Sequence, residues 1–290
     1  MQPRGFFAQI WYTFTAWGPQ LAKGAGITML IAIIGTVLGL VVGLAVGVIR
    51  TIPLGKHDGG PARRALLRVV NVILAVYIEV FRGTPMMVQA AVIYYGLRQA
   101  LGLAMSPLQA GLLVVTINSG AYLSEIVRGG IESVDPGQDE AGRALGLTHW
   151  QIMRGVVLPQ AFRNILPAVG NEFVINIKDT SVLNIISVTE LFFVGKTVAN
   201  MSYRFYESYL AIGVIYLVLT FVTTRLLRLL ERHLAGPDSY TLATSSTMPD
   251  SVIEPGGTTM QDALRLRHAN ILTGSRRAAG GTQAKGRTNG

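Results

Sequence analysis

The chain has 290 residues, of which 50% are hydrophobic and only 14% are charged, and its formal net charge is +9. Soluble domains carry roughly a quarter charged residues. The composition therefore excludes an ordinary soluble protein and predicts an integral membrane protein. The chain has no cysteine and four scattered histidines, so we predict no disulfide, no thiolate metal site and no histidine metal site.

Uncharged stretches predict the membrane spans in chain order. Residues 24–49, 99–124 and 208–224 carry no charge, and a spanning helix needs about 20 apolar residues. Two further apolar stretches, 69–97 and 165–190, are interrupted by charged residues. We therefore predict an all-α integral membrane protein with about five transmembrane helices.

The basic residues predict how these spans are oriented. Lysine and arginine gather in the 50–68 and 128–163 loops and from Arg225 onward, whereas few lie in the alternate loops. Because basic loops stay in the cytoplasm, we predict the N-terminus outside and the C-terminus in the cytoplasm. Topology thus accounts for the positive charge, and we predict membrane lipids and no nucleic acid as partners.

The two ends of the chain differ in composition from the predicted membrane domain, residues 25–235. Residues 1–24 include a group of aromatic side chains, Trp11, Tyr12, Phe14 and Trp17. Such residues are enriched at membrane interfaces, so we predict an extracytoplasmic interfacial segment rather than a cleaved signal peptide. Residues 236–290 are rich in Gly, Ser, Thr and Pro, which predicts a disordered cytoplasmic tail.

Two backbone features stand out in the first two predicted spans. The first span has glycine at positions 35, 39, 43 and 47. A row of small residues lets membrane helices pack closely, although glycine is also common in membrane helices generally. In the second stretch, proline disfavours helix at the residue before it, which predicts a helix break at Arg82, Gly83, Thr84 and Pro85. Non-helical backbone at membrane depth needs cover, so we predict that protein surrounds this break.

A polar loop, residues 135–160, connects two predicted spans on the cytoplasmic side. It contains Glu140-Ala141-Gly142-Arg143-Ala144-Leu145-Gly146 and, twelve residues on, Val156-Val157-Leu158-Pro159. We predict a turn at Asp135-Pro136-Gly137, then a helix from about Gln138 that ends with Gly146 in the left-handed conformation. A second helix should begin at an N-cap, Thr148, and end at Leu158-Pro159.

This spacing resembles the EAA loop of bacterial ABC-importer permeases, with Gly142 in place of the second alanine and Val156 in place of isoleucine. Other segments resemble, in order, the signatures of polar amino acid permeases of the histidine, glutamate, glutamine, arginine and opine group. They are Glu79 to Pro85, Ala121-Tyr122 with Glu125 and Arg128-Gly129-Gly130, and Lys178 to Leu183 followed by Glu190-Leu191.

The resemblance implies a type I ABC importer permease fold in the bacterial plasma membrane. It implies two ATP-binding subunits that hold ATP and Mg²⁺, a second permease subunit as homodimer or heterodimer, and an extracytoplasmic amino acid binding protein. It also implies that the polar loop docks on the ATPase through Glu140, Ala141, Gly142, Arg143, Leu145, Gly146 and Pro159. We predict no enzyme activity and no bound cofactor, because Gly195-Lys196-Thr197 lacks the first glycine of a P-loop.

Ionisable residues within spans are costly and are therefore functional candidates. The predicted substrate path is Glu125, Tyr122, Asn171, Glu172, Lys178, Asp179, Thr180 and Ser181. Carboxylates there would meet the ammonium of an amino acid, and the lysine, asparagine and hydroxyl groups its carboxylate or amide. Glu125 with Arg128, and Glu79 with Arg82, also have the spacing of purely structural ion pairs. The sequence does not decide between a structural ion pair and a contact with substrate.

We predict the permease subunit of an ATP-driven importer for polar amino acids, of the glutamate or glutamine type. Substrate would move inward by alternating access, coupled to ATP hydrolysis on the partner. Two other functions remain open from the sequence. They are an ion-coupled secondary amino acid carrier or channel, which needs no ATPase, and a membrane scaffold or regulator.

Overall fold

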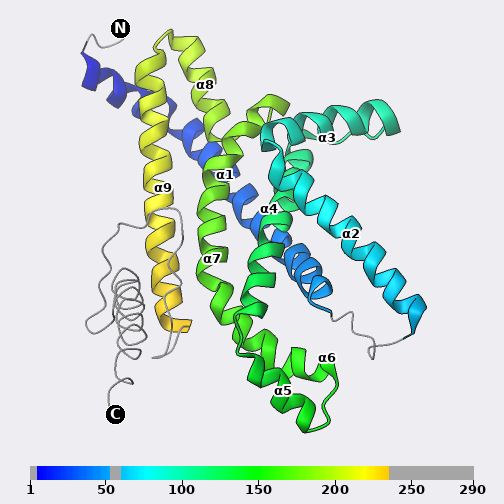
Figure 1. The fold of residues 1–290 in the computed structure, drawn as a ribbon. Coiled ribbons are helices and arrows are strands. Elements are labelled where there is room, and N and C mark those ends of the chain that lie inside the picture. Colours follow the sequence, from blue (N-terminus) through cyan, green and yellow to red (C-terminus); the bar gives the residue numbers. More distant parts are fainter. Residues whose placement is uncertain (1–4, 53–59, 235–290) are drawn as a thin grey trace, which may run out of the picture. The chain divides into compact units, whose positions relative to one another are not determined.

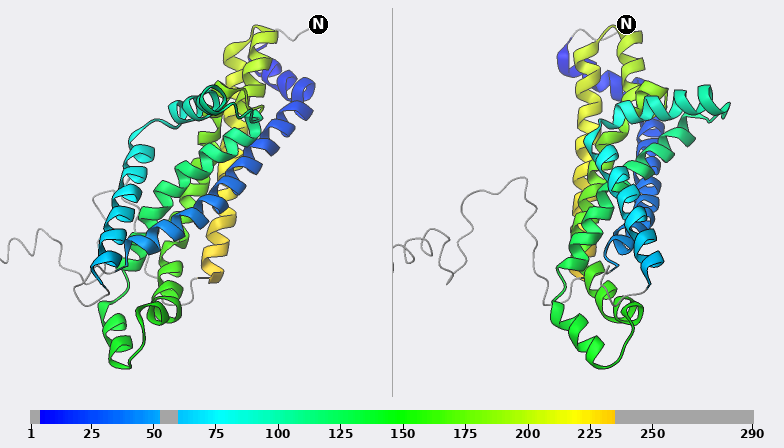
Figure 2. Two further views of the ribbon diagram at one scale, coloured as in Figure 1. Left: turned by 90° about the vertical axis from the view of Figure 1, so that its right-hand side faces the viewer. Right: turned by 45° about the vertical axis from the view of Figure 1, so that its right-hand side comes forward.

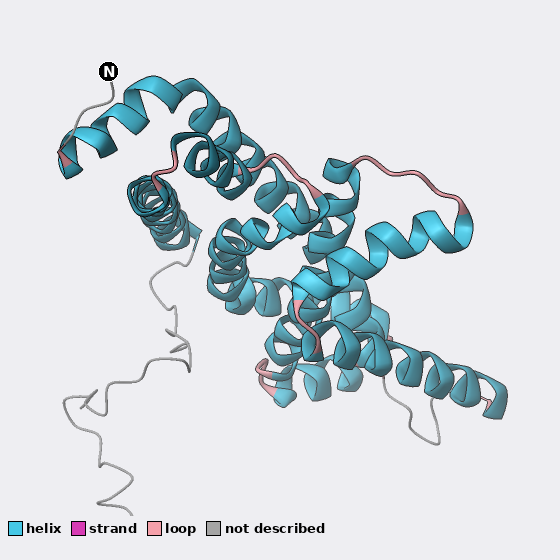
Figure 3. Cartoon of the chain, turned by 90° about the horizontal axis from the view of Figure 1, so that it is seen from above, coloured by secondary structure: helices cyan, strands magenta, loops and turns pink. Residues whose placement is uncertain are grey.

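A computed structural model describes residues 5–52 and 60–234, and these ranges contain helices and no strand (Figure 3). The prediction of an all-α fold is confirmed for them. Residues 1–4, 53–59 and 235–290 lie outside the described residues, and so does the predicted tail.

The helices follow one another along the chain with short connections (Figure 1). The first four are α1 (Phe6–Arg50), α2 (Pro61–Gly83), α3 (Met86–Leu101) and α4 (Pro107–Glu132). A short helical region follows, made of α5 (Pro136–Ala144), α6 (His149–Ile152) and the π-helix η1 (Met153–Val157). The rest is α7 (Leu158–Asp179), the 3-10 helix η2 (Thr180–Ile186), α8 (Leu191–Ser202) and α9 (Phe205–Leu234). α5 and α6 project beyond the long helices, at the end opposite the start of α1 (Figure 2).

The glycine row of α1 packs directly on α4. A Cβ atom added at Gly39 would lie 2.8 Å from Cβ of Ser119, and one at Gly43 would lie 2.8 Å from Cβ of Leu123. The outer two glycines of the row likewise face Val115 and Val127. Only glycine allows this approach, so the prediction of close helix packing is confirmed.

The number of apolar spans is lower than predicted. Within residues 5–52 and 60–234, three helices, α1, α4 and α9, have the length and hydropathy of a span. A fourth span arises if His149–Ile186 and Leu191–Ser202, which are bent by 56° at the break between them, count as one. The predicted stretch 69–97 is instead two helices, because it breaks at Pro85 and because α2 has charged residues near both ends. α1 also begins at Phe6, so the boundary predicted at residue 24 lies inside one continuous helix.

The helix break itself is confirmed, since α2 ends at Gly83 and α3 begins at Met86. The side-chain amide of Gln89 donates to the carbonyl oxygens of Phe81 and Thr84, each at 2.9 Å. Among the described residues the predicted cover of protein is incomplete, because residues 82–85 are exposed. The side-chain amide of Asn118 in α4 also donates to the carbonyl oxygen of Phe81, at 3.2 Å. Side chains from α3 and α4 therefore satisfy part of the freed backbone.

Candidate coupling loop and polar membrane residues

The first helix of the projecting loop, α5, begins earlier than predicted. Asp135 is its N-cap, with Oδ1 accepting a hydrogen bond from the amide of Gly137 at 2.8 Å, and Pro136 occupies the first helical position. Proline suits that position because its missing amide hydrogen has no partner there anyway. The three residues predicted as a turn are therefore the cap and first turn of the helix.

The end of α5 agrees with the prediction. Gly146 has a φ of 76°, the left-handed region that favours glycine. Its amide donates to the carbonyl of Arg143 at 2.9 Å, and the amide of Leu147 donates to the carbonyl of Gly142 at 3.1 Å. These two bonds satisfy carbonyl groups at the helix end and reverse the chain toward α6.

Gly142 marks the place where α5 packs against α6. It is buried, and an added Cβ would lie 2.6 Å from Cγ1 of Ile152, a side chain with no exposed surface. The position where the EAA pattern has alanine is thus a glycine that accommodates a large residue from the facing helix. Close contact at this point fixes the two short helices as one unit.

The second helix of the loop continues into the membrane domain. Thr148 is the N-cap of α6 and forms a reciprocal capping box with Gln151, as predicted for the cap. The predicted stop at Leu158-Pro159 is wrong, because the wide turn η1 leads without interruption into α7. Pro159 lies in the first turn of α7, where its missing amide is tolerated.

The tip of the loop exposes apolar side chains. Leu145 is 80% exposed and Trp150 is 60% exposed. Among the predicted docking residues, the structure places Glu140, Ala141, Arg143, Gly146 and Pro159 on the surface with Leu145, and it buries Gly142. Trp150 was not among the predicted docking residues, although a tryptophan in a polar loop was a usable signal. An exposed aromatic residue at a projecting tip is typical of a protein contact.

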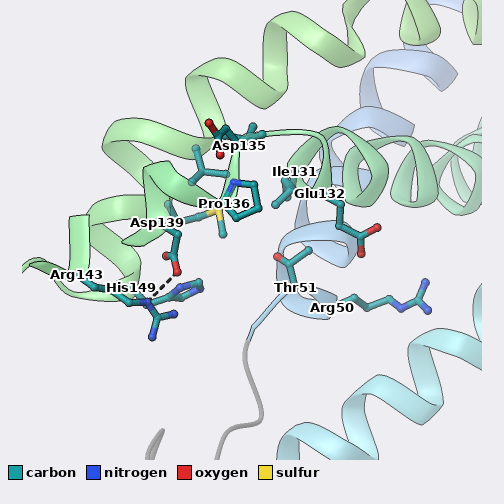
Figure 4. Close-up of a pocket in the computed structure, with 12 residues that line it drawn as sticks. Arg50, Thr51, Ile131, Glu132, Asp135, Pro136, Asp139, Arg143 and His149 are labelled. Atoms are coloured by element: carbon teal, nitrogen blue, oxygen red, sulfur yellow. Dashed lines mark hydrogen bonds and ion pairs between the residues drawn. The ribbon is translucent and has the colours of Figure 1, made fainter. Parts of the chain in front are cut away.

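A cavity of about 430 Å³ separates the loop from the end of α1 (Figure 4). Arg50 and Thr51 line it from α1, Glu132 from α4 and His149 from α6. The loop is joined to the long helices elsewhere, by an apolar cluster in which Val134, Ile152, Met153 and Val157 pack against Ile131 and Ile165. The loop therefore packs on the ends of α4 and α7, and Leu40, Leu44 and Val48 of α1 contact the same cluster.

An ion-pair network ties the end of α1 to α4 above this cavity. Glu125 pairs with Arg50 of α1 and, at 2.9 Å, with Arg128, which also pairs with Glu132 at 2.7 Å. The predicted pair of Glu125 and Arg128 is confirmed, and the contribution of Arg50 was not foreseen. The predicted substrate-path residue Glu125 is thus engaged by two guanidinium groups.

Glu79 and Arg82 of α2 have the same spacing as Glu125 and Arg128 but form no ion pair with each other. Glu79 has no basic partner within the described residues, and the guanidinium of Arg82 lies over the ring of Tyr122, 5.4 Å from its centroid. The possible structural pair of Glu79 and Arg82 is therefore absent from this chain. Tyr122, another predicted path residue, instead contacts the helix break.

The remaining predicted path residues lie on α7 and η2. Glu172 is 6% exposed and has no hydrogen-bond partner among the described side chains, and Thr180 is fully buried. The others are exposed or half-buried on the same stretch, namely Asn171, Lys178, Asp179 and Ser181. Residues 172 and 179 are two helical turns apart and share a face of α7, so the structure aligns two carboxylates along one side of that helix.

Asn176, on the same face, was missed. Its side-chain amide donates to the hydroxyl oxygens of Thr36 in α1 and Ser119 in α4, each at 2.8 Å. All three residues are buried. The available signal was an amide within the apolar run 173–177. This contact holds α7 in register with α1 and α4 beside the two carboxylates.

Glu190, from the last signature segment, has a structural position. It is fully buried, and its carboxylate accepts hydrogen bonds from the amides of Phe192 and Phe193, at 2.9 and 2.7 Å, and from the hydroxyl of Tyr216 at 2.8 Å. It caps α8 and joins that helix to α9. Its partners account for both carboxylate oxygens.

Comparison with known proteins places this arrangement in a family. Residues 59–236 match the family described as binding-protein-dependent transport system inner membrane component. The glutamine transport system permease protein GlnP of Escherichia coli (strain K12) is 41% identical over 217 residues, covering 74% of this chain and 93% of that relative. The arginine transport system permease protein ArtQ of Bacillus subtilis (strain 168) is 36% identical over 162 residues, covering 56% and 74%.

Solved structures show the same fold. An amino acid ABC transporter with histidines has a TM-score of 0.66 and 35% identity, covering 80% of this chain and 99% of that chain. An inward-facing MetNI methionine ABC transporter has a TM-score of 0.61 and 21% identity, covering 74% and 95%, which supports the fold alone. The type I ABC importer permease fold is thus confirmed. On its sequence and its fold, the chain belongs to the family of binding-protein-dependent transport system inner membrane components.

Proposed function

We propose that this chain is the permease subunit of an ATP-driven importer for polar amino acids, of the glutamate or glutamine type. The observation that carries the proposal is the projecting α5–α6 loop, which offers Leu145 and Trp150 to a cytoplasmic partner. Relatives named for glutamine and arginine transport support an amino acid as the substrate.

The partners in this proposal are two ATP-binding subunits, a second permease subunit and an extracytoplasmic amino acid binding protein. ATP and Mg²⁺ belong to the ATP-binding subunits, so this chain is non-catalytic and holds no cofactor. The N-terminus lies outside, and the loop lies in the cytoplasm, where ATP is available. The positive-inside distribution of basic residues supports that orientation.

The geometry of the loop suits a mechanical role. α5 and α6 are fixed to each other where Gly142 meets Ile152, and α6 runs through η1 into α7 without a break. A displacement of the tip by the ATPase is therefore delivered to α7. Since α7 holds the buried Asn176 and the aligned carboxylates, the same motion acts on the proposed substrate path.

The proposed path runs along the polar face of α7 into η2. Glu172 and Asp179 meet the substrate ammonium, while Lys178 and the hydroxyls of Thr180 and Ser181 meet its carboxylate or side-chain amide. Asn171 extends this polar surface on α7, and Tyr122 contributes to the proposed path from α4, where its ring contacts Arg82. For Glu125, the pairing with Arg50 and Arg128 supports an anchoring role over direct contact with substrate.

The first experiment measures uptake of labelled glutamine and glutamate in proteoliposomes that contain this chain with its ATPase and its binding protein. We expect uptake to require ATP and to be lost with Gly146→Asp, which changes the left-handed residue that shapes the docking tip. Gly155→Asp is the matched control, because that glycine has open space and no positive φ.

The alternatives give different results in the same vesicles. Uptake driven by an ion gradient without ATP, and unaffected by Gly146→Asp, would establish a secondary carrier or channel. Binding of the ATPase with no uptake of any amino acid would favour a scaffold. Uptake at wild-type rates after Glu172→Gln and Asp179→Asn, at equal surface expression, would remove those two carboxylates from the path.

A further inference from the structure

An apolar groove of about 220 Å³ lies between α1, α7 and α9. It is smaller than the roughly 300–1,000 Å³ of pockets for drug-sized ligands. Only two of the residues that line it are polar, Thr36 and Glu231. The apolar ones include Ile33 and Val37 of α1, Phe173 of α7, and Leu227 and Leu230 of α9.

The groove lies beside two membrane spans. α1 and α9 have the length and hydropathy to cross a bilayer, and their side chains Val37 and Leu230 are 56% and 49% exposed. On α7 the groove extends from residue 166 to residue 173, which is about 10 Å along the helix axis. Because apolar cavities stay dry or take apolar ligands, a narrow hydrocarbon chain suits this space better than water.

Glu231 marks the end of the groove at the membrane boundary. It is the last residue of the apolar stretch of α9, Phe205–Glu231, and it is half-buried. Its Oε1 atom would lie 3.5 Å from a Cβ atom added at Gly170, so the carboxylate reaches the groove floor. Glu231 forms no ion pair with a side chain that the structure describes, including Arg228 one turn earlier. A carboxylate at this depth favours a cationic partner.

We propose that the groove binds an acyl chain of phosphatidylethanolamine, and that Glu231 accepts a hydrogen bond from the ammonium of its headgroup. Charge complementarity selects this lipid, because an ammonium both carries the opposite charge and donates N–H groups to a carboxylate. Phosphatidylglycerol brings a net negative charge, and the trimethylated ammonium of phosphatidylcholine has no N–H group. The bound lipid would contact all three helices that line the groove.

A tryptophan in the groove wall tests where the chain lies. Val37→Trp fills the groove from α1, and Leu38→Trp is the matched control, because Leu38 is the next residue, is 47% exposed and does not line the groove. Native mass spectrometry of the intact complex, taken from bilayers of phosphatidylethanolamine, phosphatidylglycerol and phosphatidylcholine, measures the bound lipid. We expect Val37→Trp to lower bound phosphatidylethanolamine at least several-fold and the control to retain it. Equal retention in the two variants would overturn the groove as the site.

Glu231→Gln tests the headgroup contact without changing the shape of the groove. The control is Glu207→Gln on the same helix, where the carboxylate pairs with Arg204. In equimolar lipids, the native protein and the control should favour phosphatidylethanolamine several-fold, and Glu231→Gln should remove that preference. A native protein that retains the other two lipids equally well, or a preference that survives Glu231→Gln, would refute the proposal. Lipid binding needs no transport, so a complex that binds the lipid but shows no uptake would count against the proposed function alone.

Discussion

Replacing Gly142 by alanine should loosen the projecting loop. The new Cβ atom would lie 2.6 Å from Cγ1 and 2.8 Å from Cδ1 of Ile152, which is fully buried. Relief requires α5 and α6 to separate, or Ile152 to leave its preferred rotamer. The change is a test of the fit between the two helices because it adds a single methyl group.

The expected magnitude follows from the cost of overpacking. Adding a methyl group to a well-packed site destabilises it by about 1–3 kcal/mol. At about 1.4 kcal/mol for each factor of ten, local opening of residues 136–152 becomes roughly 5- to 150-fold more frequent. Ile152→Ala removes the atoms that the new methyl group meets, so the two changes should be non-additive by about 0.5–3 kcal/mol.

Amide hydrogen exchange of residues 136–152 measures this opening directly. Gly155→Ala is the control, because nothing lies within 4 Å of its added Cβ, and alanine there should leave protection unchanged or raise it. We expect faster exchange with Gly142→Ala and partial recovery when Ile152→Ala is added. Equal protection in the Gly142→Ala and Gly155→Ala proteins would refute the packing argument.

Other substitutions test separate parts of the structure. Asn176→Leu should lower the unfolding free energy in detergent by about 1–3 kcal/mol, because two buried hydroxyls lose their shared donor; an unchanged melting temperature would contradict this. Arg50→Ala should lower the unfolding free energy by about 1 kcal/mol, between the values for exposed and buried charged contacts. This loss should vanish when Glu125 has already been replaced by glutamine. Gln89→Leu should raise exchange around the α2–α3 break, and exchange no faster than in the native protein would show that the side-chain amide does not hold it. Gly146→Ala should destabilise the loop by about 1–2 kcal/mol through its positive φ, whereas Gly146→Asn should be milder, and equal effects would refute the backbone argument.

Spacing in the sequence predicted the features that depend on local geometry. The spacing of the glycine row in α1 indicated close packing on another helix, and that helix is α4. Gly146 and Thr148 were placed correctly because caps and left-handed positions are decided by neighbouring backbone groups. The helix break before Pro85 could be predicted for the same reason, because proline restricts the backbone of the residue before it.

Features that depend on residues distant in the sequence could not be predicted from local spacing. Glu125 with Arg128 and Glu79 with Arg82 have identical spacing, yet only the first pair forms. Arg50 approaches from another helix to share Glu125, whereas the ring of Tyr122 takes Arg82. Spacing allows an ion pair, and tertiary neighbours decide whether it forms.

The incorrect prediction that a helix ends at Leu158-Pro159 has the most consequence for the mechanism. A proline after a short amphipathic helix predicts a stop, but η1 widens the preceding turn so that the amide of Leu158 reaches the carbonyl of Met153. The missing amide of Pro159 then falls in a first turn that does not need it. As a result α6 is not a separate element connected by a flexible loop. The tip that exposes Trp150 and the buried face that contains Asn176 belong to one helical path, which is the connection that the proposed coupling to a partner ATPase requires.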